Sequence, residues 1–272
     1  MSQINNEIKS GERFEFGRNW QSFLTTLDEA RINEAQRSLT NLLGITDLRD
    51  KTFLDIGSGS GIFSLAAFRL GARVFSFDYD PDSVACTEFL REKFANTDKE
   101  FWQIEQGSIL DEQYLSKLGV FDIVYSWGVL HHTGSMWRAI ENFSKMVKPG
   151  GYACIAIYND QGVASKVWTK VKAKYCSGKA GKIFISALFF PYFFLRLLIS
   201  SILKKKNQFA EYKKNRGMSV IHDWVDWLGG YPFEVATVNE IFTFFKNKNF
   251  RLENIFTTES LGNNEFVFSR NN

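Results

Sequence analysis

KTFLDIGSGSG, residues 51–61, is the stretch that decides the fold of this chain. Its first part, KTFLDI, is a short run that favours a β-strand, and the residues that follow it, IFSLAAFRLGA, have the pattern of a helix. The glycines therefore stand between a strand and a helix, where a glycine-rich motif indicates a ligand site. Glycine lets the backbone approach a ligand closely, and the first turn of a helix offers free N–H groups.

The spacing of these glycines separates two kinds of ligand. Gly57, Gly59 and Gly61 form G-x-G-x-G, whereas the dinucleotide fingerprint needs its third glycine one position later, where Ile62 stands. The motif therefore disfavours NAD or FAD.

Two aspartates flank the motif. Asp55 precedes the first glycine by two residues, where its charge would repel a phosphate and attract an ammonium or sulfonium group. Asp78 ends the next predicted strand, ARVFSFDYD, where an acid is placed to accept both hydroxyls of a ribose. Either aspartate alone could instead be a helix cap or a turn residue.

Three further predicted strands continue the pattern: EFWQIEQ, the run from Phe121 to Ser126, and YACIAIYN after the turn KPGG. TVNEIFTFFKNKNF reads as a helix, and RLENIFTT and NEFVFSR read as two more strands. In this order the motifs resemble those of class I S-adenosylmethionine-dependent methyltransferases, with similarity to the type 11/12-like domain and to ubiquinone-pathway O-methyltransferases. The resemblance implies an α/β fold with a Rossmann-like seven-stranded sheet.

Four regions follow from this reading. We expect an N-terminal helical cap (1–49), a core that binds S-adenosylmethionine (50–158), a basic and apolar helical insertion after the fifth strand (159–217), and an acceptor-side segment with the closing helix and strands (218–272).

The resemblance also assigns the donor site. The methionine part would contact Asp55 and the turn, the ribose would contact Asp78, the adenine would lie beside Tyr79, Ser108 and Ile109, and the reactive methyl would lie beside Ser126 and Trp127. The turn contributes Gly57, Ser58, Gly59 and Gly61. Ser108 stands where many members of the class have an aspartate for the adenine amino group.

Candidates for proton transfer lie in the loop after the fourth strand. His131 and His132 stand there, and a neutral imidazole titrates near working pH. The loop lacks the acids that ubiquinone-pathway O-methyltransferases carry near the positions of Gly128 and His131, so we expect no metal. The strand end SWGV also differs from the Asn-Pro-Pro-Tyr signature of amino-methylating enzymes.

Acceptor contacts are expected from two segments. In FEFGRNW, Arg18 and Trp20 would touch the donor carboxylate or the acceptor. The segment RGMSVIHDWVDWLGGYPFE, residues 216–234, offers a further catalytic candidate, Asp223, and three acceptor contacts, Arg216, His222 and Asp226. Alternatively, the tryptophans of this segment are core anchors.

The charge of the chain is unevenly distributed. The net charge is +3, but residues 166–216 hold thirteen basic residues and one acid, Glu211, and so carry +12 while the rest carries −9. The same region contains an apolar run, residues 183–203, which is nominally long enough to span a bilayer. Pro191, Arg196 and the lysines at both ends disfavour spanning.

We therefore expect a helical hairpin or kinked helix that covers the acceptor pocket or dips into one leaflet, with residues 179–206 as the membrane contact. Both alternatives predict a small, apolar or lipid-linked acceptor, methylated on oxygen. We expect a cytoplasmic protein, which in the second alternative is peripheral at the membrane.

Two rival functions remain open. A tRNA-modifying methyltransferase would use the basic region for phosphates, and the loop GVLHH is similar to GVLYH of wobble-uridine carboxymethyl-transfer enzymes. As a binding partner, a lipid-linked acceptor is favoured over nucleic acid, which the sequence does not exclude. A non-catalytic, membrane-associated protein that retains the fold is the second rival.

Overall fold

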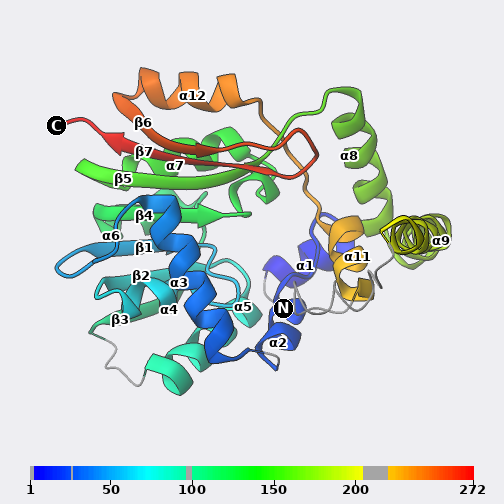
Figure 1. The fold of residues 1–272 in the computed structure, drawn as a ribbon, viewed down its shortest axis with the longest axis horizontal. Helices are drawn as coiled ribbons and strands as arrows, with labels where there is room; N and C mark the ends of the chain where they lie inside the picture. Colours follow the sequence, from blue (N-terminus) through cyan, green and yellow to red (C-terminus); the bar gives the residue numbers. More distant parts are fainter. Residues whose placement is uncertain (1–2, 26, 96–99, 205–219) are drawn as a thin grey trace.

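The computed structural model describes residues 3–25, 27–95, 100–204 and 220–272. Within them, seven strands form one sheet in the order β3-β2-β1-β4-β5-β7-β6 (Figure 1). The strands are β1 (Thr52–Ile56), β2 (Arg73–Asp78), β3 (Trp102–Gln106), β4 (Phe121–Trp127), β5 (Val147–Tyr158), β6 (Phe250–Phe256) and β7 (Asn263–Arg270). Strands β1 to β5 are parallel, and β7 is antiparallel to both β5 and β6.

Helices cover both faces of this sheet. One face packs against α3 (Glu29–Leu43), α4 (Ile62–Arg69) and α5 (Pro81–Leu90), and the other against α6 (Glu112–Leu118), α7 (Met136–Lys145) and α12 (Val238–Asn247). Successive strand residues serve opposite cores: Phe53 and Ile123 belong to the first, Leu54 and Val124 to the second. Because both faces are buried, these strands do not alternate apolar with polar residues.

The remaining helices gather beyond the carboxyl ends of the parallel strands. They are α1 (Gln3–Ser10), α2 (Gly17–Leu24), α8 (Val163–Cys176), α9 (Lys179–Leu203) and α11 (Val220–Gly229) (Figure 1). The strand order reverses between β1 and β4, and in such sheets a ligand crevice opens at that point. Of the predicted cap 1–49, only α1 and α2 lie there, because α3 buries Ile32 and Leu39 against the sheet.

The described part of the insertion after β5 is helical, and α9 is one continuous helix rather than a hairpin. Pro191 lies inside it on the exposed side. A proline removes one helical hydrogen bond. Ile185, Phe189 and Phe193, at four-residue spacing, pack against α8 and α11 and hold the helix across that position. Of the two forms predicted for this run, a hairpin or a kinked helix, the structure therefore excludes the hairpin and leaves the single helix.

Candidate donor and acceptor cavity

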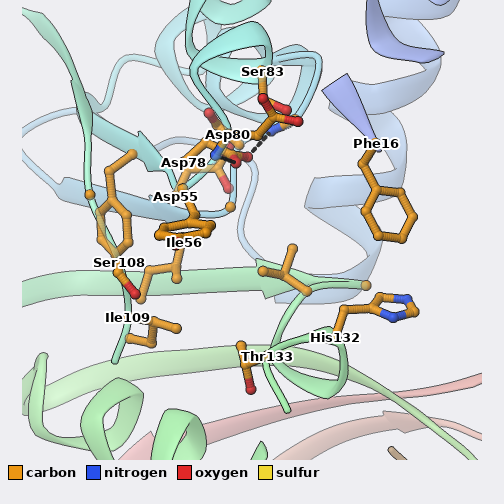
Figure 2. A pocket seen from close by; sticks show the side chains of 18 of the residues that line it. Phe16, Asp55, Ile56, Asp78, Asp80, Ser83, Ser108, Ile109, His132 and Thr133 are labelled. Atoms are coloured by element: carbon orange, nitrogen blue, oxygen red, sulfur yellow. Dashed lines mark hydrogen bonds between the residues drawn. The ribbon is translucent and has the colours of Figure 1, made fainter. Parts of the chain in front are cut away.

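A cavity of about 1150 Å³ opens at the carboxyl ends of β1, β2 and β4 and is covered by the N-terminal segment. Figure 2 shows Asp55, Asp78 and Asp80 on one side of it and Phe16 and His132 on another. The volume exceeds the range of about 300–1,000 Å³ that is usual for one small ligand. Two molecules can therefore meet inside it.

The glycine turn after β1 forms the floor of the first half. The N–H groups of Gly57 and Ser58 donate to the carbonyl oxygen of Phe77, at 2.8 and 3.2 Å, and tie the turn to β2. Gly59 has a φ of 55°, and a Cβ added to it would stand 2.9 Å from Nε1 of Trp20. Any other residue would be strained there and would displace the indole that covers the turn.

Asp78 lies at the end of β2 and faces the cavity. Its carboxylate accepts hydrogen bonds from the N–H groups of Gly59 and Asp80, both at 2.9 Å. A carboxylate has about four acceptor positions, so about two remain for a ligand. That number fits the two hydroxyls of a ribose. Burial raises the pKa of Asp78 to about 6.

Asp55 is buried beside the turn and receives a chain of hydrogen bonds. The Ser64 hydroxyl donates to its Oδ2 at 2.5 Å, Ser76 lies 2.8 Å from Ser64, and Nε1 of Trp102 donates to Ser76 at 2.9 Å. Burial, with the nearby Asp78 adding to it, raises the pKa of Asp55 to about 7. The side chain lines the cavity, where a positively charged ligand would favour its ionised form.

Helix α1 reaches the adenine side of the predicted donor site. The Tyr79 hydroxyl donates to Oε1 of Glu7 at 2.9 Å, and Nε of Arg13 donates to the other oxygen of that carboxylate at 2.9 Å. The Arg13 guanidinium also stands 4.9 Å from the centre of the Tyr79 ring. We call Glu7, Arg13 and Tyr79 the latch. The latch could not be predicted from the sequence, since an ion pair between a helix and a loop leaves no periodic pattern.

The other donor residues fall in two groups. Ser58, Ser108, Ile109 and Trp127 line the same cavity. Gly61 is not among the lining residues and stands at the start of α4. Ser126 does not line it: its side chain is buried, and its hydroxyl donates to the carbonyl oxygen of Ile56 at 2.9 Å. Its predicted place beside the methyl is therefore corrected, because the pleat of β4 turns this side chain into the sheet.

Of the two loop histidines, only His132 lines the cavity. Its Nδ1 lies 2.5 Å from the carbonyl oxygen of Pro232, so Nδ1 carries the proton and Nε2 keeps its lone pair. Burial lowers the pKa of His132 to about 3, which keeps the ring neutral. His131 is fully buried, and its Nδ1 accepts from the N–H of Tyr158 at 3.3 Å. The structure thus replaces its predicted proton transfer with a packing role.

Apolar groups surround His132 and form the second half of the cavity. The Phe16 ring lies 5.1 Å from the His132 ring, and Phe14, Tyr158 and Pro232 also line this half. The Arg13 guanidinium donates to the carbonyl oxygen of His132 at 3.2 Å, so the latch touches both halves. None of these apolar positions was predicted, because they come from segments far apart in the sequence.

The predicted acceptor contacts are only partly within the described structure. Trp20 lines the cavity, but on the glycine turn rather than in the acceptor half. Arg216 lies outside the described residues, and so do the side chains of Arg18, in α2, and of His222, Asp223 and Asp226, in α11. Trp227 packs on Trp168 and Trp224 on Phe193, in agreement with the alternative of core anchors. Among the described residues, no group of three or more His, Cys, Asp or Glu side chains is placed to hold a metal ion.

Residues 27–187 match a family model described as a methyltransferase domain. The chain belongs to this methyltransferase family. The match covers more than half of the 272 residues and confirms the predicted class, a class I methyltransferase that depends on S-adenosylmethionine.

Curated relatives match over shorter stretches. Ribosomal protein L11 methyltransferase of Acinetobacter baylyi is 51% identical over 47 residues, 17% of this chain and 16% of that protein. tRNA U34 carboxymethyltransferase of Pseudoalteromonas translucida is 32% identical over 107 residues, 39% and 32% of the two chains. Ubiquinone biosynthesis O-methyltransferase of Paraburkholderia xenovorans is 27% identical over 135 residues, which are 47% of this chain and 53% of that protein. The chain thus spans between 16% and 53% of the length of these three relatives.

Solved structures share the fold. The magnesium protoporphyrin IX methyltransferase of Synechocystis PCC 6803, with bound SAH, has a TM-score of 0.53 at 13% identity and covers 88% of this chain and 83% of that one. An O-methyltransferase family protein from Burkholderia thailandensis has a TM-score of 0.52 at 11% identity, and the similarity covers 89% of this chain and 58% of that one. These similarities confirm the predicted Rossmann-like methyltransferase fold.

Proposed function

We propose that this methyltransferase transfers the methyl group of S-adenosylmethionine to an oxygen of a small, apolar or lipid-linked acceptor. The observation that carries the proposal is the cavity itself, which is lined by carboxylates and glycines in one half and by aromatic side chains around a neutral histidine in the other. The polar half suits a charged sugar-bearing donor, and the apolar half suits a hydrophobic acceptor.

The residues of the polar half would hold the donor. Asp78 offers acceptor positions to the ribose hydroxyls, and the turn at Gly59 leaves space for a ligand against the backbone. When bound, the donor supplies a methyl group on a positively charged sulfur, and Asp55 favours that charge. The latch residue Tyr79 and the neighbouring Ile109 would flank the adenine.

The residues of the apolar half would align the acceptor. A direct displacement depends mainly on positioning, and a hydroxyl acceptor also has to lose its proton. Nδ1 of His132 carries the ring proton and donates it to the carbonyl oxygen of Pro232. Nε2 therefore has a free lone pair, which can accept a hydrogen bond from that hydroxyl. With a pKa of about 3, His132 is a weak base, which favours orientation of the hydroxyl over storage of its proton.

The donor half is tested by calorimetric titration of the full chain with S-adenosylmethionine. We expect Asp78→Asn to lower the affinity roughly 10- to 100-fold, since a hydrogen bond to a charged group is worth about 1.5–3 kcal/mol. Asp47→Asn is a matched control, because Asp47 is paired with Arg49 on the surface. An unchanged affinity in Asp78→Asn would remove the basis of the proposal.

The acceptor half is tested by offering the enzyme methyl-labelled S-adenosylmethionine with a total lipid extract or with total tRNA. We expect label in the lipid fraction. The result would contradict the proposed acceptor if label entered only tRNA or only protein.

A tRNA substrate is the second candidate, favoured by the match to the tRNA U34 carboxymethyltransferase and by the basic region. Lys166, Lys170 and Lys174 belong to α8 and lie outside the cavity lining. Binding of tRNA would have to weaken steeply with salt, because each phosphate contact releases a counterion.

A further inference from the structure

The side of α9 that faces away from the protein is apolar along its whole length. Every exposed residue from 183 to 203 is apolar or aromatic except Arg196: Ile183, Phe184, Ala187, Leu188, Pro191, Tyr192, Phe194, Leu195, Leu198, Ile199, Ile202 and Leu203. The exposed fraction is 69% for Ile183 and 78% for Leu203. Single exposed apolar residues are ordinary, but a continuous row marks an interaction site. We call this set the outer face of α9.

The opposite face of α9 already holds the helix to the protein. Phe189 lies 5.3 Å from Trp168 of α8, Phe193 lies 5.5 Å from Trp224 of α11, and Ile185 is buried between the same helices. The outer face is therefore not needed to place α9. The exposed surfaces of Ile183, Leu188, Leu195, Ile199 and Leu203 on this face are available to another partner.

The surroundings of the outer face indicate an anionic lipid surface. Lys179 and Lys182 stand at one end of α9 and Lys204 follows the other, and the sequence has no acid from residue 161 to residue 204. An apolar face with basic ends is the pattern of helices that lie in a membrane interface. RNA offers phosphates for the lysines and bases that stack on aromatic rings, but nothing for the seven large exposed aliphatic side chains. A second copy would bring like-charged ends close together.

The topology determines how α9 can meet the bilayer. Among the described residues, α9 is the one helix long and apolar enough to cross a membrane by length and composition. However, β5 precedes it and β7 follows it, and these strands pair from Tyr152–Ser269 to Tyr158–Asn263. A single crossing would put those two strands on opposite sides of the bilayer. Any contact of α9, about 37 Å long at 1.5 Å per residue, with a bilayer therefore requires the helix to lie along the surface.

We propose that the outer face of α9 docks the protein in the plane of an anionic lipid bilayer. The docking is independent of the proposed methyl transfer, because it depends only on this surface and its lysines. The N-terminal segment connects this region to the cavity, because Phe14 lines the cavity and also packs on the cluster that contains Ile185. Docking would bring the acceptor half of the cavity close to molecules dissolved in the bilayer.

The experiment is flotation of the full chain with vesicles of phosphatidylcholine alone or of an equimolar mixture with phosphatidylglycerol. The test variant is L195D/I199D, which changes two outer-face residues that are 54% and 47% exposed. Its matched control is V120D/F256D, which adds the same charges at residues that are 53% and 49% exposed elsewhere. Titration with S-adenosylmethionine checks that each variant keeps its donor site.

We expect the wild type and V120D/F256D to float with the anionic vesicles and L195D/I199D to bind them at least about tenfold more weakly, since two buried aliphatic side chains are lost. K179Q/K204Q should weaken anionic binding by about fivefold per lysine and leave phosphatidylcholine binding unchanged.

Three outcomes would overturn the proposal. One is flotation of L195D/I199D like the wild type, and another is failure of the wild type to bind either kind of vesicle. The third is a dimer in sedimentation that L195D/I199D dissociates while vesicles remain unbound, because a second copy would then cover the outer face. Salt-sensitive binding of the wild type to RNA, with no binding to vesicles, would overturn the proposal in the same way as the second outcome.

Discussion

His132 shows how one contact can set the chemistry of a side chain. The carbonyl oxygen of Pro232 fixes the proton on Nδ1, and burial lowers the pKa of the ring to about 3. A histidine with its ordinary pKa would change charge between pH 5 and 8. In this cavity the ring stays neutral across that range, so its Nε2 is an acceptor at every working pH.

We predict that His132→Gln lowers the turnover number about tenfold, because one amide cannot occupy both nitrogen positions of the imidazole and the hydrogen bond that orients the acceptor hydroxyl is worth about 1 kcal/mol. The affinity for S-adenosylmethionine should stay unchanged, since the histidine lies in the acceptor half. Transfer of labelled methyl to the lipid fraction measures the first quantity and calorimetry the second. Ser135→Ala is the control on the same loop, because Ser135 is exposed and its side chain makes no cap hydrogen bond. Equal turnover in His132→Gln and Ser135→Ala would refute the role.

Sequence reasoning succeeded for single residues where a motif links type to position. Asp55, Asp78 and the turn glycines stand where the strand–turn–helix pattern placed them. It failed for Ser126 and His131, because side-chain direction depends on the pleat of β4 and on the turn that follows it. Ser126 stands between Tyr125 and Trp127, which line the cavity, and a strand position next to a cavity-lining residue points to the opposite face.

At the scale of elements, the N-terminal segment closes the cavity through few contacts. Helix α1 is attached by the latch, and the N–H of Gly17, at the start of α2, donates to Oδ2 of Asp80 at 2.9 Å. Asp80 in turn caps α5 through the N–H of Asp82. The cover is therefore tied to the loop that follows β2.

We predict that Arg13→Gln lowers the affinity for S-adenosylmethionine by about three- to tenfold, because the pair with Glu7 is half-buried and each such bond is worth about 1 kcal/mol. Hydrogen exchange of residues 3–10 should become faster in the same variant. Arg37→Gln is the matched control, since Arg37 pairs with Glu34 on an open helix surface. If both variants exchange and bind alike, the latch does not hold the cover.

The periodicity of the sequence predicted the strands and the order of elements well, because motifs of neighbouring residues define them. It did not predict the continuity of α9. A proline inside an apolar run predicts a break in the helix. Aromatic contacts with α8 and α11 hold α9 on both sides of Pro191. Those contacts join residues that are more than twenty positions apart.

At the scale of the whole molecule, two buried carboxylates link donor binding to pH. Asp55 and Asp78 have pKa values of about 7 and about 6, whereas aspartate in an unfolded chain titrates near about 3.9. The donor-free fold therefore binds more protons than the unfolded chain in this window. The contribution of these two protonated carboxyl groups to the stability of the donor-free fold is fully present below about pH 4 and is lost as the pH rises toward about 7.

We predict the opposite trend for donor binding. The positive donor and its ribose hydroxyls favour the ionised carboxylates, so affinity should rise about tenfold or more from about pH 5.5 to about pH 7.5, with proton release on binding. Calorimetry in two buffers of different ionisation enthalpy measures both effects. Asp78→Asn should flatten the profile. An affinity that does not vary with pH in the wild type would show that neither carboxylate titrates in this range.

The backbone N–H of Phe14 donates to the carbonyl oxygen of Tyr231 at 3.0 Å. During translation, these two residues leave the ribosome far apart in time. The strands that carry Asp55 and Asp78 are complete long before Tyr231 is made, but the segment that closes over them has to wait for its partner. A nascent chain can thus form an open cavity early, and it gains an enclosed one only after residue 231 has been made.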